Sequence, residues 1–117
     1  MNFSGKAAVV TGGAMGNGRA IALGLAREGA DIVVADVNLP LAESTCAEAR
    51  ALGRRTLAIQ TDVSKKSEVE NLFQRTLDEF GRIDILVNNA GVTSRQDILK
   101  LAEEEWDRVL DINLKGV

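Results

Sequence analysis

The chain has 117 residues, of which 45% are hydrophobic and 26% are charged, as expected for a globular chain with one modest core. Its net charge of −3 argues against nucleic acid or an anionic membrane as a partner, because both attract clustered lysines and arginines. Histidine is absent, which excludes Ser-His and Cys-His catalysis and any histidine-based metal site, so no metal is expected.

The first residues and the single cysteine bear on where the protein works. Residues 1–6 lack the apolar segment of a signal peptide, and no uninterrupted apolar stretch is long enough to span a bilayer. Cys46 has no second cysteine to pair with, which excludes an internal disulfide and fits a reducing compartment. A cytoplasmic protein is therefore expected.

Four short apolar runs, rich in β-branched residues and without clean alternation, predict strands that are covered on both faces. They are Ala7–Val10, Ile32–Ala35, Thr56–Ile59 and Ile83–Val87. The segments between them predict helices at about 17–28, 38–53 and 64–81. Strand and helix in regular alternation favour right-handed crossovers and a Rossmann-type doubly wound parallel sheet, an α/β fold.

The helices carry end signals and a buried stripe. In the third helix the apolar positions follow the helical repeat: Val69, Leu72, Phe73, Thr76, Leu77 and Phe80. Ser64 is expected to be its N-cap and Gly81 its left-handed terminator. In the first helix, Ile21, Ala22 and Leu25 are expected to face inward.

The C-terminal end of the sequence looks incomplete. A last helix is predicted to begin near Glu103 and still continues at Asn113. The strand at 83–87 would be left as an unpaired apolar edge, which natural domains avoid. No linker or domain boundary is visible, so residues 1–117 are expected to form the N-terminal part of a single longer domain, truncated after about four strands.

A glycine-rich turn follows the first strand directly, with the sequence Thr11-Gly-Gly-Ala-Met-Gly-Asn-Gly18. Gly12 permits a tight turn, Gly16 lets a pyrophosphate approach the backbone, and Gly18 lets the helix pack closely on the sheet. The first helical N–H groups would then face the phosphates. No lysine lies in the turn, so it is not an ATPase phosphate loop. A plain strand-to-helix turn is the alternative reading.

Asp36 lies at the end of the second strand, 20 residues after Gly16 (36 − 16 = 20). A carboxylate there can accept hydrogen bonds from both ribose hydroxyls of an adenosine, although a helix N-cap is the alternative. A 2′-phosphate at about 4 Å would be repelled by about 4 kcal/mol before screening. Neither Val37 nor Met15 is an arginine that could offset this repulsion. The sequence therefore predicts NAD rather than NADP as cofactor.

Four motifs together resemble the short-chain dehydrogenase/reductase family. They are Thr11-Gly-x-x-x-Gly-x-Gly18, Asp62-Val63, Asn88-Asn-Ala-Gly91 and Asn113. The likeness covers the whole chain and is strongest to 3-oxoacyl-carrier-protein reductases and sugar-alcohol dehydrogenases. It implies an NAD-dependent oxidoreductase that acts on a small-molecule carbonyl or alcohol substrate, with residues 1–117 as its NAD-binding part.

The resemblance also implies residue roles. The expected cofactor-binding residues are Gly12, Met15, Gly16, Asn17, Gly18, Asp36, Asp62, Val63, Asn89, Ala90 and Gly91. Among them, Asp62 would bind the adenine amino group, and its alternative role is that of a turn residue before the third helix. Thr11 would brace the turn against the fourth strand, and a purely structural role is the alternative for Asn88. Asn17 departs from the family, which usually has an apolar residue there.

Asn113 is the catalytic residue that the resemblance assigns to this chain, as the holder of a water in a proton relay; a plain helical polar residue is the alternative. The catalytic Ser and Tyr-x-x-x-Lys have no match, and tyrosine is absent. The 117-residue chain alone is therefore expected to be inactive, and the longer parent to be a homo-oligomer. The alternative function is a non-catalytic Rossmann module that binds an adenine nucleotide.

Overall fold

The computed structural model describes residues 2–89, which contain four strands and three helices in alternation. In chain order these are β1 (Ala7–Thr11), α1 (Gly16–Arg27), β2 (Asp31–Asp36), α2 (Leu39–Ala51), β3 (Thr56–Gln60), α3 (Lys66–Phe80) and β4 (Ile85–Asn88). Each predicted strand and each of the first three predicted helices is present. The predicted last helix, from Glu103, lies outside the described residues.

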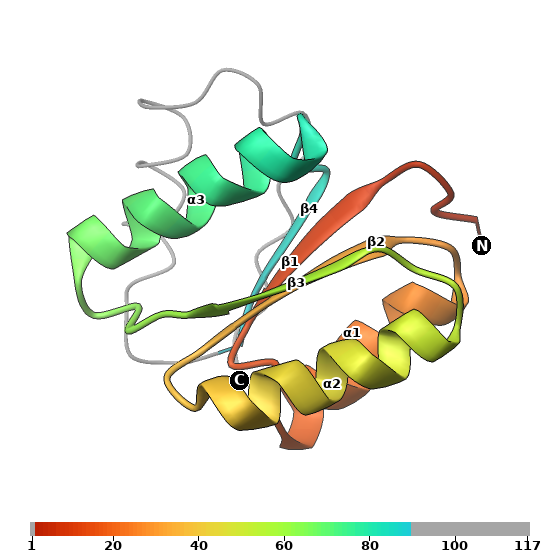
Figure 1. Ribbon diagram of the computed structural model, residues 1–117, viewed down its shortest axis with the longest axis horizontal. Coiled ribbons are helices and arrows are strands. Elements are labelled where there is room, and N and C mark those ends of the chain that lie inside the picture. The colour runs from red at the N-terminus through yellow and green to blue at the C-terminus, as the bar shows by residue number, and fades with distance from the viewer. Residues whose placement is uncertain (1, 90–117) are drawn as a thin grey trace.

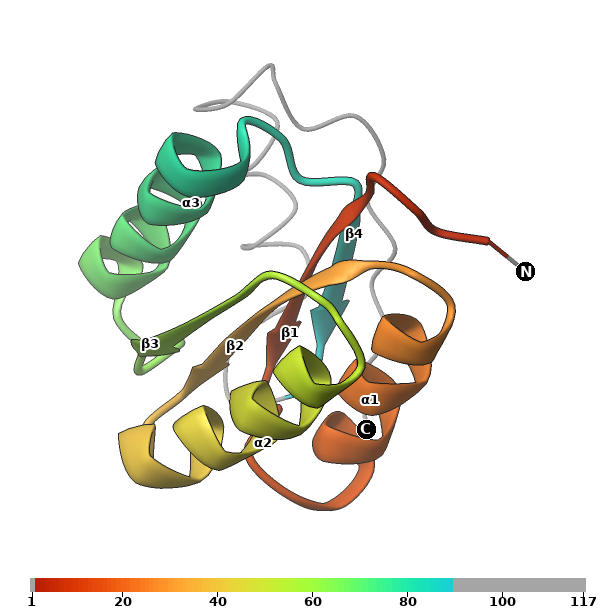
Figure 2. The same ribbon diagram turned by 45° about the vertical axis from the view of Figure 1, so that its right-hand side comes forward.

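The four strands form one parallel sheet in the order β3-β2-β1-β4 (Figure 1). Thr11 at the end of β1 pairs with Ala35 on one side and Asn88 on the other, and Asp36 pairs with Gln60. The carboxyl ends of the strands therefore share one edge, toward which the arrowheads point in Figure 2. The strand order reverses at β1, which confirms the doubly wound topology.

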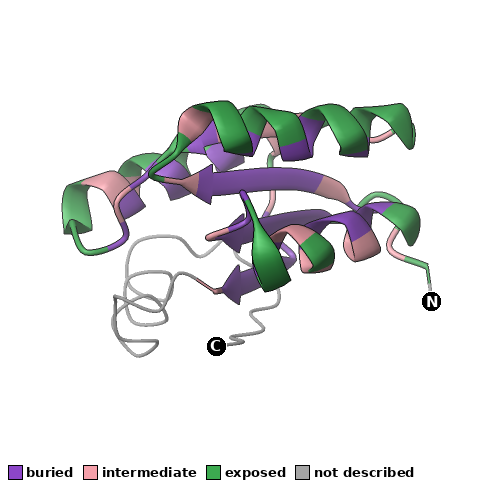
Figure 3. Cartoon of the chain, turned by 90° about the horizontal axis from the view of Figure 1, so that it is seen from below, coloured by how far each residue is buried: buried purple, intermediate pink, exposed green. Residues whose placement is uncertain are grey.

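The core has one layer on each face of the sheet, because successive side chains of a strand point to opposite faces. Val9 and Val33 pack with Phe73 of α3, whereas Val10 and Val34 pack under α1 and α2. Figure 3 shows the buried strands between helices whose outer faces are exposed. Both faces of β1 and β2 are thus covered, which explains their apolar runs without alternation.

The helix ends follow local signals in most places. Asn38 is the N-cap of α2, and its side chain accepts a hydrogen bond from the Leu41 N–H at 3.1 Å. Gly81 ends α3 in the left-handed conformation with φ of 76°, as predicted. The prediction for Ser64 is wrong: the N-cap of α3 is Lys65, because the Ser64 hydroxyl bonds to Asp62 instead.

The residues that the helices bury match the residues predicted from the apolar periodicity only in part. Ala22 of α1 is buried as predicted, but Ile21 and Leu25 are half-buried at the margin of the core, and Leu23 and Ala26 fill it. The predicted stripe of α3 is buried from Val69 to Leu77, with Phe80 half-buried at its end. Within residues 2–89 no helix is long and apolar enough to cross a membrane.

The fourth strand begins two residues later than predicted, because Asp84 is used for another purpose. The residue is 1% exposed, and its side chain accepts a hydrogen bond from the Ala7 N–H at 2.8 Å, while its own N–H donates to the Ala7 carbonyl at 2.9 Å. Arg82 forms a bidentate ion pair with the same carboxylate at 2.6 and 2.7 Å. Asp84 thereby fastens the chain before β4 to the first residue of β1.

Candidate nucleotide-binding site

The glycine turn between β1 and α1 has a backbone that requires glycine at three positions. Gly12 and Gly16 have φ of 65° and 61°, a region that other residues rarely adopt. At Gly18 an added Cβ would lie 1.9 Å from the Gly12 carbonyl oxygen. Gly12 thus adopts the tight-turn conformation expected of it, and the absence of a Cβ at Gly18 lets α1 lie close against the residue that follows β1.

The N-terminus of α1 is open. Its N-cap is Met15, and no side chain in residues 2–89 accepts a hydrogen bond from the first turn. A Cβ on Gly16 would have no atom within 4 Å, and Met15 and Asn17 are both exposed. Uncapped N–H groups at the positive end of a helix, beside a glycine that leaves space, form a cradle that fits a pyrophosphate.

Asp36 faces this turn from the end of β2. Its Oδ2 accepts a hydrogen bond from the Ala14 N–H at 3.2 Å, and its Oδ1 accepts one from the Asn38 N–H at 2.9 Å. Asp36 is therefore not the N-cap of α2, a position that Asn38 occupies, but it supports that cap. A carboxylate has about four acceptor positions, so two bonds leave capacity for the hydroxyls of a ribose.

Helix α2 supports the same turn through residues that sequence reasoning did not identify. The buried Thr45 donates its hydroxyl to the Ala14 carbonyl at 3.4 Å, so both backbone groups of Ala14 are held from the β2–α2 side. Arg19 of α1 forms a bidentate ion pair with Glu48 of α2. A threonine inside a predicted helix and an ion pair between two helices carry no local sequence signal.

Asp62, two residues beyond the end of β3, lies near Asp36. The Thr61 N–H donates to the Asp36 carbonyl at 3.0 Å, which joins the two strand ends. The Asp62 Oδ1 accepts hydrogen bonds from the Ser64 hydroxyl at 2.6 Å and the Ser64 N–H at 3.0 Å, and these bonds lower the pKa of Asp62. The turn role weighed for Asp62 is thus present. The Val63 side chain is buried in the core under α3.

The third part of the site is the joint between β1 and β4. The Thr11 hydroxyl donates to Asn88 Oδ1 at 2.9 Å and accepts a hydrogen bond from the Asn89 N–H at 3.0 Å, as the predicted brace requires. Asn89 Nδ2 donates to the Gly12 carbonyl at 3.3 Å, so the end of β4 holds the first glycine of the turn. Asn88 is buried and serves this structural role.

The structure thus brings most of the predicted site residues to one edge of the sheet. Gly12, Gly16 and Gly18 form the turn, and Asp36 lies beside it. The carboxyl ends of β1, β2, β3 and β4 meet at this edge, next to the point where the strand order reverses, which is where open α/β sheets bind ligands. Three predicted site residues, Ala90, Gly91 and Asn113, lie outside the described residues.

Comparison with known proteins identifies relatives along the whole chain. A family model described as short chain dehydrogenase matches residues 6–117. The 2-dehydro-3-deoxy-D-gluconate 5-dehydrogenase of Escherichia coli (strain K12) is 45% identical over 116 residues, which are 99% of this chain and 45% of that protein. A 3-oxoacyl-(acyl-carrier-protein) reductase of Staphylococcus epidermidis is 43% identical over 113 residues, 96% of this chain and 46% of that protein.

Solved structures agree with these relatives. The crystal structure of NAD+-bound xylitol dehydrogenase matches with a TM-score of 0.75 and 36% identity, covering 78% of this chain and 35% of that one. The predicted likeness to 3-oxoacyl-carrier-protein reductases and sugar-alcohol dehydrogenases is confirmed. The chain spans less than half the length of the curated relatives it matches.

Proposed function

Because the chain belongs to the short-chain dehydrogenase family, we propose that it is the NAD-binding part of an oxidoreductase that acts on a small-molecule carbonyl or alcohol. The observation that carries this proposal is the pairing of an open helix N-terminus with an acidic strand end. The Ala14 N–H of the turn donates to Asp36 Oδ2, so the two halves of an adenosine-diphosphate cradle are in direct contact.

In this proposal, different residues of the described part of the chain bind different parts of the cofactor. The N–H groups of Gly16, Asn17 and Gly18, after Met15, would hold the pyrophosphate. Asp36 would accept the ribose hydroxyls, and Asp62 with the backbone of Val63 would contact the adenine. Bound NAD supplies the nicotinamide ring that gives or takes the hydride.

The remaining roles follow from the family resemblance. Asn89, Ala90 and Gly91 would line the cofactor beside β4, and Asn113 would be the catalytic residue within this chain. We propose that the Ser and the Tyr-x-x-x-Lys of the family lie in sequence after Val117. The complete protein would be a cytoplasmic homo-oligomer, and residues 1–117 would form part of one longer domain.

We propose that the negative charge of Asp36 makes the site selective for NAD over NADP. The carboxylate already accepts hydrogen bonds from the N–H of Ala14 in the turn and the N–H of Asn38 before α2, and Met15 and Val37 are exposed and uncharged. Arg19 of α1 is held in an ion pair by Glu48. A 2′-phosphate would therefore meet a negative charge without a free cation from these residues to offset it.

The source DNA after codon 117 tests the enzymatic part of the proposal. We expect an open reading frame that encodes a Ser and, shortly after it, Tyr-x-x-x-Lys, since the curated relatives are more than twice as long as this chain. A stop codon directly after Val117 would contradict the oxidoreductase and leave the non-catalytic adenine-nucleotide-binding module.

A further inference from the structure

Both backbone polar groups of Asp62, its N–H and its carbonyl, are hydrogen-bonded to residues between β3 and the first turn of α3. The Asp62 N–H donates to Glu68 Oε1 at 2.8 Å, and its carbonyl accepts a hydrogen bond from the Lys65 N–H at 3.0 Å. Both partners come from the start of α3, so the helix N-terminus fixes the backbone of the residue proposed to face adenine. Glu68 also lies 3.8 Å from the Lys65 ammonium, which keeps the contacts in one network.

The Asp62 side chain is fixed by a single residue, Ser64. The Ser64 hydroxyl and the Ser64 N–H both donate to Oδ1, at 2.6 and 3.0 Å. Within residues 2–89 no donor contacts Oδ2. One oxygen is thus saturated by the loop while the other keeps its acceptor capacity. The same two hydrogen bonds lower the pKa of Asp62, so the carboxylate stays ionised and can only accept.

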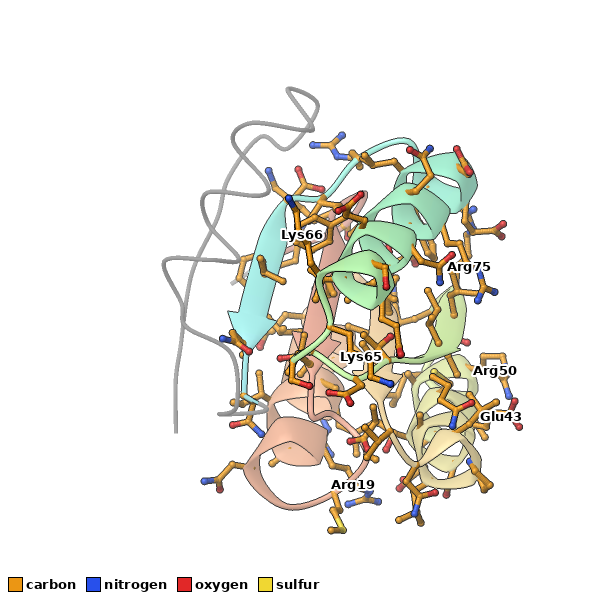
Figure 4. The ribbon with its side chains drawn as sticks, turned by 90° about the vertical axis from the view of Figure 1, so that its left-hand side faces the viewer. Arg19, Glu43, Arg50, Lys65, Lys66 and Arg75 are labelled. Carbon is orange, nitrogen blue, oxygen red and sulfur yellow. The ribbon has the colours of Figure 1, made fainter. Side chains whose placement is uncertain are left out.

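The position of this carboxylate relates it to the rest of the cradle. The Thr61 N–H donates to the Asp36 carbonyl at 3.0 Å and so joins the ends of β2 and β3. Asp62 is the next residue in the chain after this contact. In Figure 4 the β4 arrowhead marks the carboxyl ends of the strands. Lys65, just before α3, and Arg19 of α1 both lie toward that end. Asp62 therefore lies on the same edge as the ribose acceptor Asp36.

We propose that Ser64 is a positioning residue for adenine recognition: it occupies Oδ1 of Asp62 with two hydrogen bonds and so leaves Oδ2 oriented to accept the adenine 6-amino group. This inference rests on the proposed NAD-binding function. Without the hydroxyl, only the Ser64 N–H at 3.0 Å holds Oδ1, so the carboxylate is less firmly oriented and an amino donor must order it further on binding. Ser64 therefore affects the preference for adenine over other bases, and not the binding of the phosphates or the ribose.

The test compares NAD with nicotinamide hypoxanthine dinucleotide, in which a carbonyl oxygen replaces the 6-amino group. Both are titrated calorimetrically into the wild-type 117-residue chain and into Ser64→Ala, Ser64→Thr and Ser67→Ala. Ser67 is the matched control, because it is an exposed serine in the first turn of α3 without a contact to Asp62. Circular dichroism checks that each variant is folded.

We expect the wild-type chain to prefer NAD by about tenfold or more, since a carboxylate accepts from an amino group and repels a carbonyl oxygen. Ser64→Ala should reduce that preference about fivefold, mainly by weakening NAD, whereas Ser64→Thr and Ser67→Ala should retain it. An unchanged preference in Ser64→Ala, with NAD still bound, overturns this inference alone. A wild-type chain that binds neither dinucleotide overturns the proposed function and this inference with it.

Discussion

At Gly18 the space that a side chain would need is already filled by the backbone of the turn. A Cβ there would lie 1.9 Å from the Gly12 carbonyl oxygen and 2.7 Å from Asn89 Nδ2. Neither the turn nor the end of β4 can move without losing the Asn89–Gly12 hydrogen bond. The residue is therefore a structural requirement of the cradle as well as a feature of the motif.

Gly18→Ala should lower the free energy of unfolding by about 1–3 kcal/mol, as other insertions into filled space do. Gly24 provides the matched control in the same helix, because a Cβ there would have no atom within 4 Å. Gly24→Ala should raise stability by up to about 1 kcal/mol through helix propensity. Urea denaturation of the three proteins measures both effects, and an unchanged midpoint for Gly18→Ala would contradict the packing.

Single residues were predictable where the backbone itself imposes the choice. The glycine pattern predicts the conformation at Gly12, because it depends on one local strand–turn–helix unit. The contact of Thr11 with Asn88 of β4, 77 positions away, was expected from the family resemblance and not from a local signal. The N-cap prediction for Ser64 is wrong because the helix begins one residue later than that role requires, and the Ser64 hydroxyl donates to the Asp62 carboxylate instead of accepting a hydrogen bond from a helix N–H. Thr45 was missed because its partner is 31 positions away.

The residue directly before β4 is Asp84, a buried and charged aspartate that fixes where the strand begins. Burial raises the pKa of Asp84, but the hydrogen bonds from Arg82 and from the Ala7 N–H, with the charges of Arg82 and Lys6, outweigh that effect. The pKa of Asp84 is therefore held below its ordinary value. A carboxyl whose pKa is lower in the folded state stabilises the fold above its ordinary pKa, and this stabilisation is lost as pH falls through the folded value.

Asp84→Asn should destabilise the chain by about 1–3 kcal/mol near neutral pH, because the Ala7 N–H and Arg82 lose a charged acceptor. The deficit should shrink as pH falls below the ordinary aspartate pKa of about 4, and it should vanish once pH passes the lowered pKa of the folded carboxyl. Urea denaturation across this range measures the difference. Asp78→Asn, on the exposed face of α3, is the control and should change stability by less than about 0.5 kcal/mol at any pH. A deficit independent of pH would contradict the charged role of Asp84.

The order and type of the elements were predictable because their signals are periodic. Runs covered on both faces marked the strands, and left-handed glycines such as Gly81 marked helix ends. The start of β4 was not predictable to the residue, since Asp84 lies within an apolar run but bonds to Ala7, 77 positions away. Local patterns identify an element, whereas its exact bounds depend on partners distant in the sequence.

At the scale of the whole molecule, the arrangement β3-β2-β1-β4 gathers four strand ends at one edge. The glycine turn, Asp36 and Asp62 all follow those ends, and hydrogen bonds join them to one another. Doubly wound topology was inferable from the alternation of elements, because right-handed crossovers leave few other arrangements. The contacts that connect α2 and α3 to the cradle required the structure.

The role of Asp36 is tested by calorimetric titration of the 117-residue chain with NAD and with NADP under the same salt conditions. Asp36 at the edge of an open pyrophosphate cradle predicts that NAD binds and that NADP binds at least about tenfold more weakly, because its 2′-phosphate meets the carboxylate. Comparable affinities for the two, or tighter binding of NADP, would contradict the role assigned to Asp36.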